Sequence, residues 1–144
     1  MALGKKIAKN LSGGEVFGLV GELGAGKTVF VKGLAKGLGI TNNISSPTFV
    51  LMKVYPVERG KSQAVEQDKS KVKHKSIKYL VHVDAYRLKN IKSWIEVGLE
   101  EYLQSKESIV IIEWAEKVRK LMPKKARFIN IEHLSASQRR IKIS

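Results

Sequence analysis

Apolar and polar positions alternate along the chain with two different periods, which predicts an α/β fold. Short runs that are continuously apolar, or that alternate apolar with polar residues, are typical of strands. Apolar residues spaced three or four apart are typical of helices that bury one face. The predicted strands span residues 15–20, 49–55, 77–84 and 108–113. The predicted helices span residues 1–11, 28–38, 90–103 and 114–122.

Three of these helices carry further local signals. Leu3, Ile7 and Leu11 lie on one face of the first, which is therefore expected to be amphipathic. Gly98 is expected to break or kink the third, because glycine is a poor helix former. Pro123 is expected to end the fourth, because the residue before a proline is disfavoured in the helical region.

The C-terminal part of the chain predicts a pair of antiparallel edge strands. Residues 128–133 and 140–143 both alternate apolar with polar side chains, and a polar turn at 135–138 joins them. This pair is expected to complete a mixed sheet flanked by helices and to carry little chemistry.

Residues 1–144 are expected to form a single domain, because the chain shows neither an internal repeat nor a linker. One polar insertion, approximately residues 56–76, interrupts the apolar pattern. It is expected to be a solvated hairpin extension or a mobile loop. Contact between this insertion and nucleic acid is a second possibility.

Between the first predicted strand and the next helix lies Gly21-Glu-Leu-Gly-Ala-Gly-Lys-Thr28, which matches the phosphate-binding pattern G-x-x-x-x-G-K-T. Glycine lets the backbone curl until successive N–H groups point at a phosphate. Lys27 adds a positive charge for the phosphates, and Thr28 offers a hydroxyl to Mg²⁺. The fold is thus expected to be P-loop NTPase-like, with ATP and Mg²⁺ as cofactors. The predicted nucleotide contacts are Glu22, Leu23, Gly24, Ala25, Gly26, Lys27, Thr28 and Val29.

Two carboxylates end predicted strands, at the sheet edge where open α/β folds bind ligands. Glu113 closes the apolar run 108–113, the Walker B arrangement whose acid reaches Mg²⁺ directly or through water. Asp84 closes 77–84 and is a second site candidate. Near them, His82 is expected to be a core residue.

Thr48 is a candidate for a switch residue that senses the γ-phosphate and Mg²⁺. Threonine or serine often serves this purpose in the segment after the first helix of a P-loop protein. The alternative is that Ser46-Pro47-Thr48 is an ordinary turn that starts a strand.

Charge and composition bear on partners and location. The 27 Lys and Arg residues against 13 Asp and Glu leave a net charge of +14, which attracts polyanions such as tRNA. The alternative is a proteome that favours lysine on solvated faces. The chain has no cysteine, which excludes disulfides and thiol chemistry. No apolar run is long enough to cross a membrane, and the start lacks a secretion signal, so a cytoplasmic location without membrane contact is expected.

Taken in order, four motifs resemble the TsaE family, also called YjeE, of ATPases in tRNA threonylcarbamoyladenosine biosynthesis. They are Gly21-Glu-Leu-Gly-Ala-Gly-Lys-Thr28, Ser46-Pro-Thr-Phe49, His82-Val-Asp-Ala-Tyr-Arg87 and Ile111-Ile-Glu-Trp-Ala-Glu116. The resemblance implies a small P-loop ATPase that supports TsaD and TsaB in placing threonylcarbamoyl on adenosine 37 of tRNAs reading codons that begin with A. tRNA is then an indirect partner, with direct contact possible.

The resemblance also implies roles for single residues. Lys27 and Thr28 would hold phosphate and Mg²⁺, and Glu113 would belong to the magnesium shell. Asp84 would be associated with hydrolysis, and Thr48 lies in the segment that resembles a switch. Two departures are Val29, where the family usually has a second threonine, and the insertion before Ile77, which is longer than usual.

Two other functions compete with a partner-controlled ATPase that is slow alone. The chain is alternatively a docking module in which ATP sets a binding conformation and hydrolysis only resets it. A small P-loop kinase is the third reading, although no arginine-rich lid segment follows the P-loop.

Overall fold

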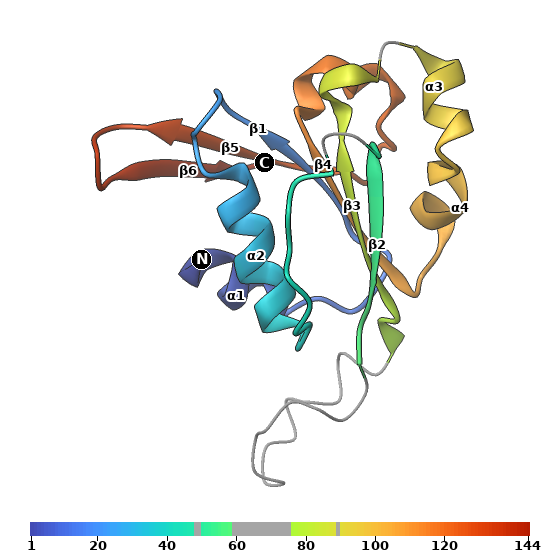
Figure 1. Cartoon of the computed structure of the whole chain (residues 1–144), viewed down its shortest axis with the longest axis horizontal. Coiled ribbons are helices and arrows are strands. Elements are labelled where there is room, and N and C mark those ends of the chain that lie inside the picture. The colour runs from blue at the N-terminus through green and yellow to red at the C-terminus, as the bar shows by residue number, and fades with distance from the viewer. Residues whose placement is uncertain (48–49, 59–75, 89) are drawn as a thin grey trace, which may run out of the picture.

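A computed structural model describes residues 1–47, 50–58, 76–88 and 90–144 of the chain. One six-stranded sheet runs through the molecule in the order β2-β3-β4-β1-β5-β6 (Figure 1). Its strands are β1 (Val16–Val20), β2 (Met52–Pro56), β3 (Tyr79–Asp84), β4 (Ser108–Glu113), β5 (Arg127–His133) and β6 (Arg139–Ile143). The helices are α1 (Ala2–Ala8), α2 (Lys27–Gly37), η2 (Ala85–Arg87), α3 (Ile91–Glu96), α4 (Leu99–Gln104) and η3 (Ala115–Leu121).

The centre of the sheet is parallel and its two edges are antiparallel. β1 pairs in parallel with β4 and β5, and β4 pairs in parallel with β3. β2 and β6 run antiparallel to their neighbours β3 and β5. The predicted mixed sheet flanked by helices, with antiparallel C-terminal strands, is therefore confirmed.

The sheet separates two hydrophobic cores. On one face α1 and α2 cover side chains of the central strands, among them Phe17, Leu80 and Ile111. On the other face α3, α4 and η3 cover the alternate residues of the same strands, such as Val81 and Val110. Because successive strand residues point to opposite faces, a strand with both faces covered is apolar throughout. This explains the continuous apolar run of β4, which is buried along its whole length.

The helix predicted over 114–122 is present from Ala115 to Leu121 and ends before Pro123 as predicted, but it is a kinked 3₁₀-helix. Trp114 lies in the left-handed region with φ 59°, and a 3₁₀-helix, η3, follows it. A 3₁₀-helix has three residues per turn and so places residues i and i+3 on one face. Ala115 and Val118, which are both buried, have that spacing. Val118 itself has the non-helical angles φ −124° and ψ 18°, so η3 is kinked at this residue, and both buried side chains belong to the core on this face of the sheet.

The other helices agree with the predictions except at their ends. The break at Gly98 is confirmed, because this residue separates α3 from α4 with φ 73°. α1 ends at Ala8 rather than at residue 11. Leu3 and Ile7 pack partly buried against the core, as expected of an amphipathic helix.

Two predictions in the middle of the chain have different outcomes. The strand predicted over 49–55 begins late, at Met52, because the Leu51 N–H donates to the Pro47 carbonyl and closes a turn. Leu51 itself has a φ of 64°. Residues 59–75 of the predicted insertion lie outside the described residues, so its form stays a prediction.

Among the described residues, no helix has the length and apolar character that crossing a bilayer requires.

Close packing of α1 against α2 depends on small residues. A Cβ placed on Gly4 would lie 2.4 Å from the Phe30 carbonyl oxygen and 2.8 Å from the Leu34 nitrogen, both backbone atoms of α2. Alanine normally stabilises a helix over glycine by about 1 kcal/mol. Here overpacking, which typically costs about 1–3 kcal/mol, should exceed that gain.

We therefore expect Gly4→Ala to lower the free energy of unfolding, measured by denaturant titration. The control is Lys6→Ala, since Lys6 is exposed on the same helix and its truncation should be nearly neutral. A Gly4→Ala variant that is more stable than the wild type would show that α1 does not pack on α2 in this way.

Candidate functional site

A cavity of about 640 Å³ lies where the loop after β1 turns into α2. Gly24 and Gly26 in this loop have φ angles of 78° and 107°, which side-chain-bearing residues rarely adopt. Nothing lies within 4 Å of a Cβ added to either glycine, so strain and not crowding selects glycine there. The lining residues are Leu23, Gly24, Gly26, Lys27, Thr28, Val29, Ser46, Asp84, Tyr86, Arg87, Glu113 and Trp114.

The ammonium of Lys27 is folded against the loop that precedes it. It donates to the carbonyl oxygens of Gly21 and Glu22 and lies 3.7 Å from the centre of the Trp114 ring. Lys27 is buried. Burial lowers the pKa of Lys27, whereas the nearby carboxylates of Glu113, Glu116 and Asp84 oppose that shift. A cation held in this way is available to a phosphate, which offers it a stronger partner than a neutral carbonyl does.

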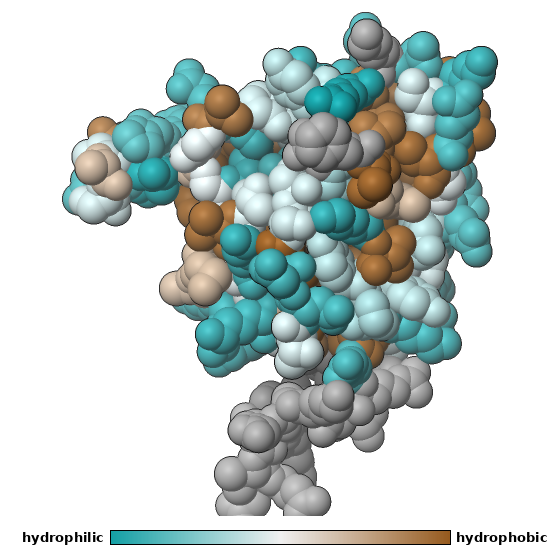
Figure 2. Space-filling model, in the orientation of Figure 1, coloured by the Kyte–Doolittle hydropathy of each residue, from teal (hydrophilic) through white to brown (hydrophobic). Residues whose placement is uncertain are grey.

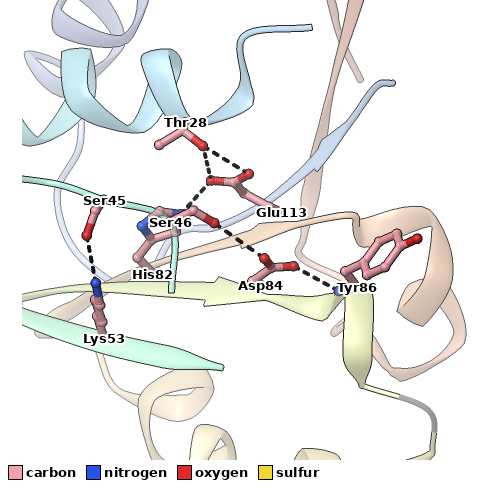
Figure 3. A network of polar contacts seen from close by, with 8 residues as sticks. All are labelled: Thr28, Ser45, Ser46, Lys53, His82, Asp84, Tyr86 and Glu113. Carbon is pink, nitrogen blue, oxygen red and sulfur yellow. Dashed lines mark hydrogen bonds and ion pairs between the residues drawn. The ribbon is translucent and has the colours of Figure 1, made fainter. Parts of the chain in front are cut away.

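Thr28, Glu113 and His82 form a chain of hydrogen bonds below the loop (Figure 3). The Thr28 hydroxyl donates to Glu113 Oε1 at 3.0 Å, and His82 Nε2 lies 2.7 Å from the same oxygen. A carboxylate only accepts, so Nε2 of His82 carries the proton. His82 Nδ1 has no hydrogen-bond partner within the described part of the chain. Glu113 is thus a buried carboxylate whose orientation is set by two donors.

Asp84 is held separately, also at the edge of the cavity. Its Oδ1 accepts from the Tyr86 backbone N–H at 2.9 Å and its Oδ2 accepts from the Ser46 hydroxyl at 3.3 Å. Figure 3 shows the Asp84 carboxylate on β3, between Ser46 and the backbone of Tyr86. Asp84 therefore connects the strand end to the segment that follows α2.

The sheet topology explains why the two carboxylates meet. β3 and β4 are parallel neighbours, and their register pairs Asp84 with Glu113. β4 is also the parallel neighbour of β1, whose end feeds the loop and Thr28. Carboxyl ends of parallel strands gather at one edge, so acids that end β3 and β4 lie beside the loop that ends β1.

Most of the predicted site residues come together at this cavity. Leu23, Gly24, Gly26, Lys27, Thr28 and Val29 line it, as do Asp84 and Glu113. Glu22 and Ala25 belong to the loop but are not among the lining residues. Thr48 lies outside the described residues, so its role as a switch stays a prediction.

Five further residues of the site were not predicted as site residues: Ser46, Tyr86, Arg87 and Trp114 line the cavity, and His82 contacts Glu113. Ser46 and Trp114 lie within predicted motifs but were given no role, and no local signal distinguished them. His82 was expected to be a satisfied core residue, and it is indeed fully buried. A signal was nevertheless present: His82 and Asp84 are two residues apart on one strand, so they point to the same face.

His82→Leu is expected to destabilise the protein and to weaken the Mg²⁺-dependent nucleotide binding that the sequence predicts, for which ADP is the probe. It removes one of the two donors to a buried carboxylate, which typically costs about 1–3 kcal/mol. Denaturant titration and calorimetry of ADP with and without Mg²⁺ would measure the two effects. His133→Leu, an exposed histidine of β5, is the control. Wild-type stability and Mg²⁺ dependence in His82→Leu would mean that His82 does not position Glu113.

Comparison with known proteins identifies the family. A family model described as threonylcarbamoyl adenosine biosynthesis protein TsaE matches residues 1–141. The chain belongs to the TsaE family. This membership places it among the proteins of tRNA threonylcarbamoyladenosine biosynthesis.

Individual TsaE relatives and one solved structure are similar along most of the chain. TsaE of Treponema pallidum is 34% identical over 141 residues, which covers 98% of this chain and 90% of the relative. TsaE of Bacillus subtilis is 32% identical over 140 residues, covering 97% and 75% of the two chains. The crystal structure of YdiB from Bacillus subtilis matches with a TM-score of 0.68 and 30% identity, over 97% of this chain and 74% of YdiB.

Proposed function

We propose that this TsaE-family protein binds Mg-ATP and hydrolyses its γ-phosphate in support of tRNA threonylcarbamoylation. The reaction it supports would be the one on adenosine 37 of tRNAs reading codons that begin with A, with TsaD and TsaB as its partners. One observation carries the ATPase proposal. The Thr28 hydroxyl in the first turn of α2 contacts the Glu113 carboxylate that ends β4, and both residues line one cavity together with Lys27.

The side chains present fit ATP with Mg²⁺. Hydroxyl and carboxylate oxygens are the hard ligands that Mg²⁺ prefers, and Thr28 and Glu113 supply both types. No cluster of three or more His, Asp or Glu residues suited to a metal occurs among the described residues. In Mg-nucleotide sites the phosphates and water supply most of the coordination shell.

Some of the site residues bind the phosphates and the ion, and another positions the reacting groups. Lys27 and the loop N–H groups bind the phosphates and stabilise charge that develops during transfer. Thr28 and Glu113 would hold the ion, which supplies Lewis-acid stabilisation of the phosphate oxygens when it is bound. Asp84, fixed by Ser46 and the Tyr86 N–H, orients the attacking water or a group of the magnesium shell. Because Glu113 and not Asp84 contacts Thr28, Glu113 is the carboxylate that would hold the ion together with Thr28.

The rim of the cavity supports control by a partner. Leu23 is 89% exposed, and Val29 and Tyr86 are about half exposed, although all three line the site. A rim that is both apolar and open favours a second protein that covers it and excludes water. We therefore expect slow hydrolysis by the protein alone.

The test is phosphate release from Mg-ATP by the pure protein, with and without TsaD and TsaB. A slow rate that changes when both partners are added is expected. The same rate in their presence and absence, together with no detectable binding to them, would contradict the proposed partners. A phosphoryl-acceptor screen would then test the kinase alternative.

The docking-module alternative is tested by a variant in which hydrolysis is blocked. Asp84→Asn should retain ATP but lose turnover, since the amide keeps the shape but not the charge of the carboxylate. If hydrolysis is needed in each cycle, this variant gives no modified tRNA. One round of modification per complex, followed by arrest, would show instead that hydrolysis only resets the assembly.

A further inference from the structure

The C-terminal hairpin of β5 and β6, expected to carry little chemistry, contacts the P-loop. Arg139, the first residue of β6, donates from Nε to the Ala25 carbonyl oxygen at 3.1 Å, although 114 residues separate the two in sequence. Its Nη1 donates to the carbonyls of Ser135 and Gln138 at 2.8 and 3.0 Å. One guanidinium therefore joins the hairpin turn to the phosphate-binding loop. Figure 2 shows this hairpin projecting from the left of the body with a largely hydrophilic tip.

The hydrogen bond to the Ala25 carbonyl also sets the direction of the Gly26 N–H, because both groups belong to the same peptide. In a trans peptide the C=O and the N–H point in opposite directions. When Arg139 holds the Ala25 carbonyl on the hairpin side, the Gly26 N–H of the same peptide is turned away from the hairpin. Gly26 lines the cavity and Ala25 does not. The contact thus favours the peptide orientation in which the Gly26 N–H is available to a phosphate.

Arg139 restrains the carbonyl of this peptide, whereas other contacts hold its neighbours: Ala25 is buried and its N–H donates to the Glu22 carbonyl, and the Gly26 carbonyl accepts from the Phe30 N–H. Gly24 and Gly26 both have positive φ, and no atom lies within 4 Å of a Cβ built on either. Glycine occupies positive and negative φ about equally, so backbone rotation at Gly24 and Gly26 is limited less by their own sterics than it is at Ala25 between them. The start of the loop is held differently, since Gly21 approaches the Ile131 carbonyl of β5 too closely for any side chain. β5 therefore supports the start of the loop, and Arg139 of β6 supports its centre.

We propose that Arg139 is a positioning residue that preorganises the P-loop for phosphate by fixing the Ala25–Gly26 peptide. The inference rests on the proposed nucleotide binding and adds a residue to it. Arg139 is not among the residues that line the cavity, so it acts through the loop and not on the nucleotide. Its effect should fall on binding of any nucleotide that places a phosphate in the loop, ADP and ATP alike.

The chain offers a matched control in the adjacent residue. Arg140 points to the opposite face of β6, as successive strand residues do, and pairs with Glu132 at 3.3 Å on an exposed surface. Arg140→Ala removes the same charge and side chain from the same strand without touching the loop. Exposed ion pairs contribute little to stability, so this variant should fold like the wild type.

The experiment is calorimetric titration of Mg-ADP and Mg-ATP into wild type, Arg139→Ala, Arg139→Lys and Arg140→Ala, with steady-state hydrolysis and thermal melting of each. We expect Arg139→Ala to lose about tenfold in affinity for both nucleotides, the effect of about one charge-assisted hydrogen bond. Its kcat at saturating ATP and its melting temperature should stay close to those of Arg140→Ala. Arg139→Lys should recover part of the affinity, because an ammonium donates to a carbonyl but cannot span the loop and the turn together.

Three results would overturn the inference. These are equal affinities in Arg139→Ala and Arg140→Ala, a fall in kcat with affinity intact, or an affinity loss accompanied by a much lower melting temperature. A wild-type protein that binds neither nucleotide would instead overturn the proposed function, so the two failures are distinguishable.

Discussion

Lys27→Ala is expected to lower the affinity for ATP and ADP by at least about a hundredfold and to abolish hydrolysis. The Lys27 ammonium donates to two carbonyl oxygens and lies over the Trp114 ring, and phosphates would give it negatively charged hydrogen-bond partners in place of the neutral carbonyls. Hydrogen bonds to charged groups contribute about 1.5–3 kcal/mol each, and about 1.4 kcal/mol corresponds to a factor of ten. Calorimetry of Mg-ADP and phosphate release from Mg-ATP would measure the two losses.

Lys27→Ala should not lower the free energy of unfolding, although it lowers the affinity for nucleotide. Burial lowers the pKa of Lys27, so holding this ammonium charged costs folding free energy. That cost is fully present below the lowered pKa and disappears as the pH rises towards the ordinary value of 10.5. Lys32→Ala, an exposed lysine of α2, is the control and should bind nucleotide normally. Wild-type affinity in Lys27→Ala would contradict the proposed site.

The lowered pKa of Lys27 also predicts how nucleotide binding depends on pH. Phosphate favours the charged ammonium, so the complex should hold the Lys27 proton to higher pH than the free protein does. Affinity for ADP should therefore decrease as the pH rises through the lowered pKa of Lys27. In Lys27→Ala this alkaline decrease should be absent, which separates it from the titration of other groups.

Glu113→Gln should leave nucleotide binding without Mg²⁺ nearly unchanged and reduce turnover by at least about a hundredfold. The amide has the size of the carboxylate, and its oxygen still accepts from His82, so the local structure should persist. The lost negative charge removes the group that would hold Mg²⁺ beside Thr28, and metal stabilisation of a phosphoryl transition state contributes several kcal/mol. Single-turnover hydrolysis and Mg²⁺ titration of ADP binding would measure the effect.

Glu107→Gln is the matched control for this variant. Glu107 precedes β4 at its opposite end and pairs with Lys78 on a half-exposed surface, far along the strand from the cavity. Its removal should leave turnover unchanged, since exposed ion pairs contribute little. A Glu113→Gln variant that hydrolyses ATP as fast as Glu107→Gln would mean that Glu113 does not hold the metal.

Local sequence was informative where a structural feature depends on neighbouring residues. The P-loop is a single contiguous segment whose glycines have the required φ preferences themselves, so its position between a strand and a helix was predictable. The strands at the centre were predictable because burial on both faces leaves only apolar residues. The backbone at the edge of the site was less predictable from sequence, because Trp114 has a positive φ that its side chain does not favour and η3 is a 3₁₀-helix kinked at Val118.

By itself the sequence determined the glycine-rich loop between β1 and α2, the acids that end β3 and β4, and the alternation of strands and helices, because each depends on residues close together in the chain. Only the tertiary structure decided which distant side chains touch. The order β3-β4-β1-β5-β6 brings Glu113 to Thr28 and His82 to Glu113, and the C-terminal hairpin brings Arg139 to Ala25. These contacts depend on strand order and register, and neighbouring residues do not encode either.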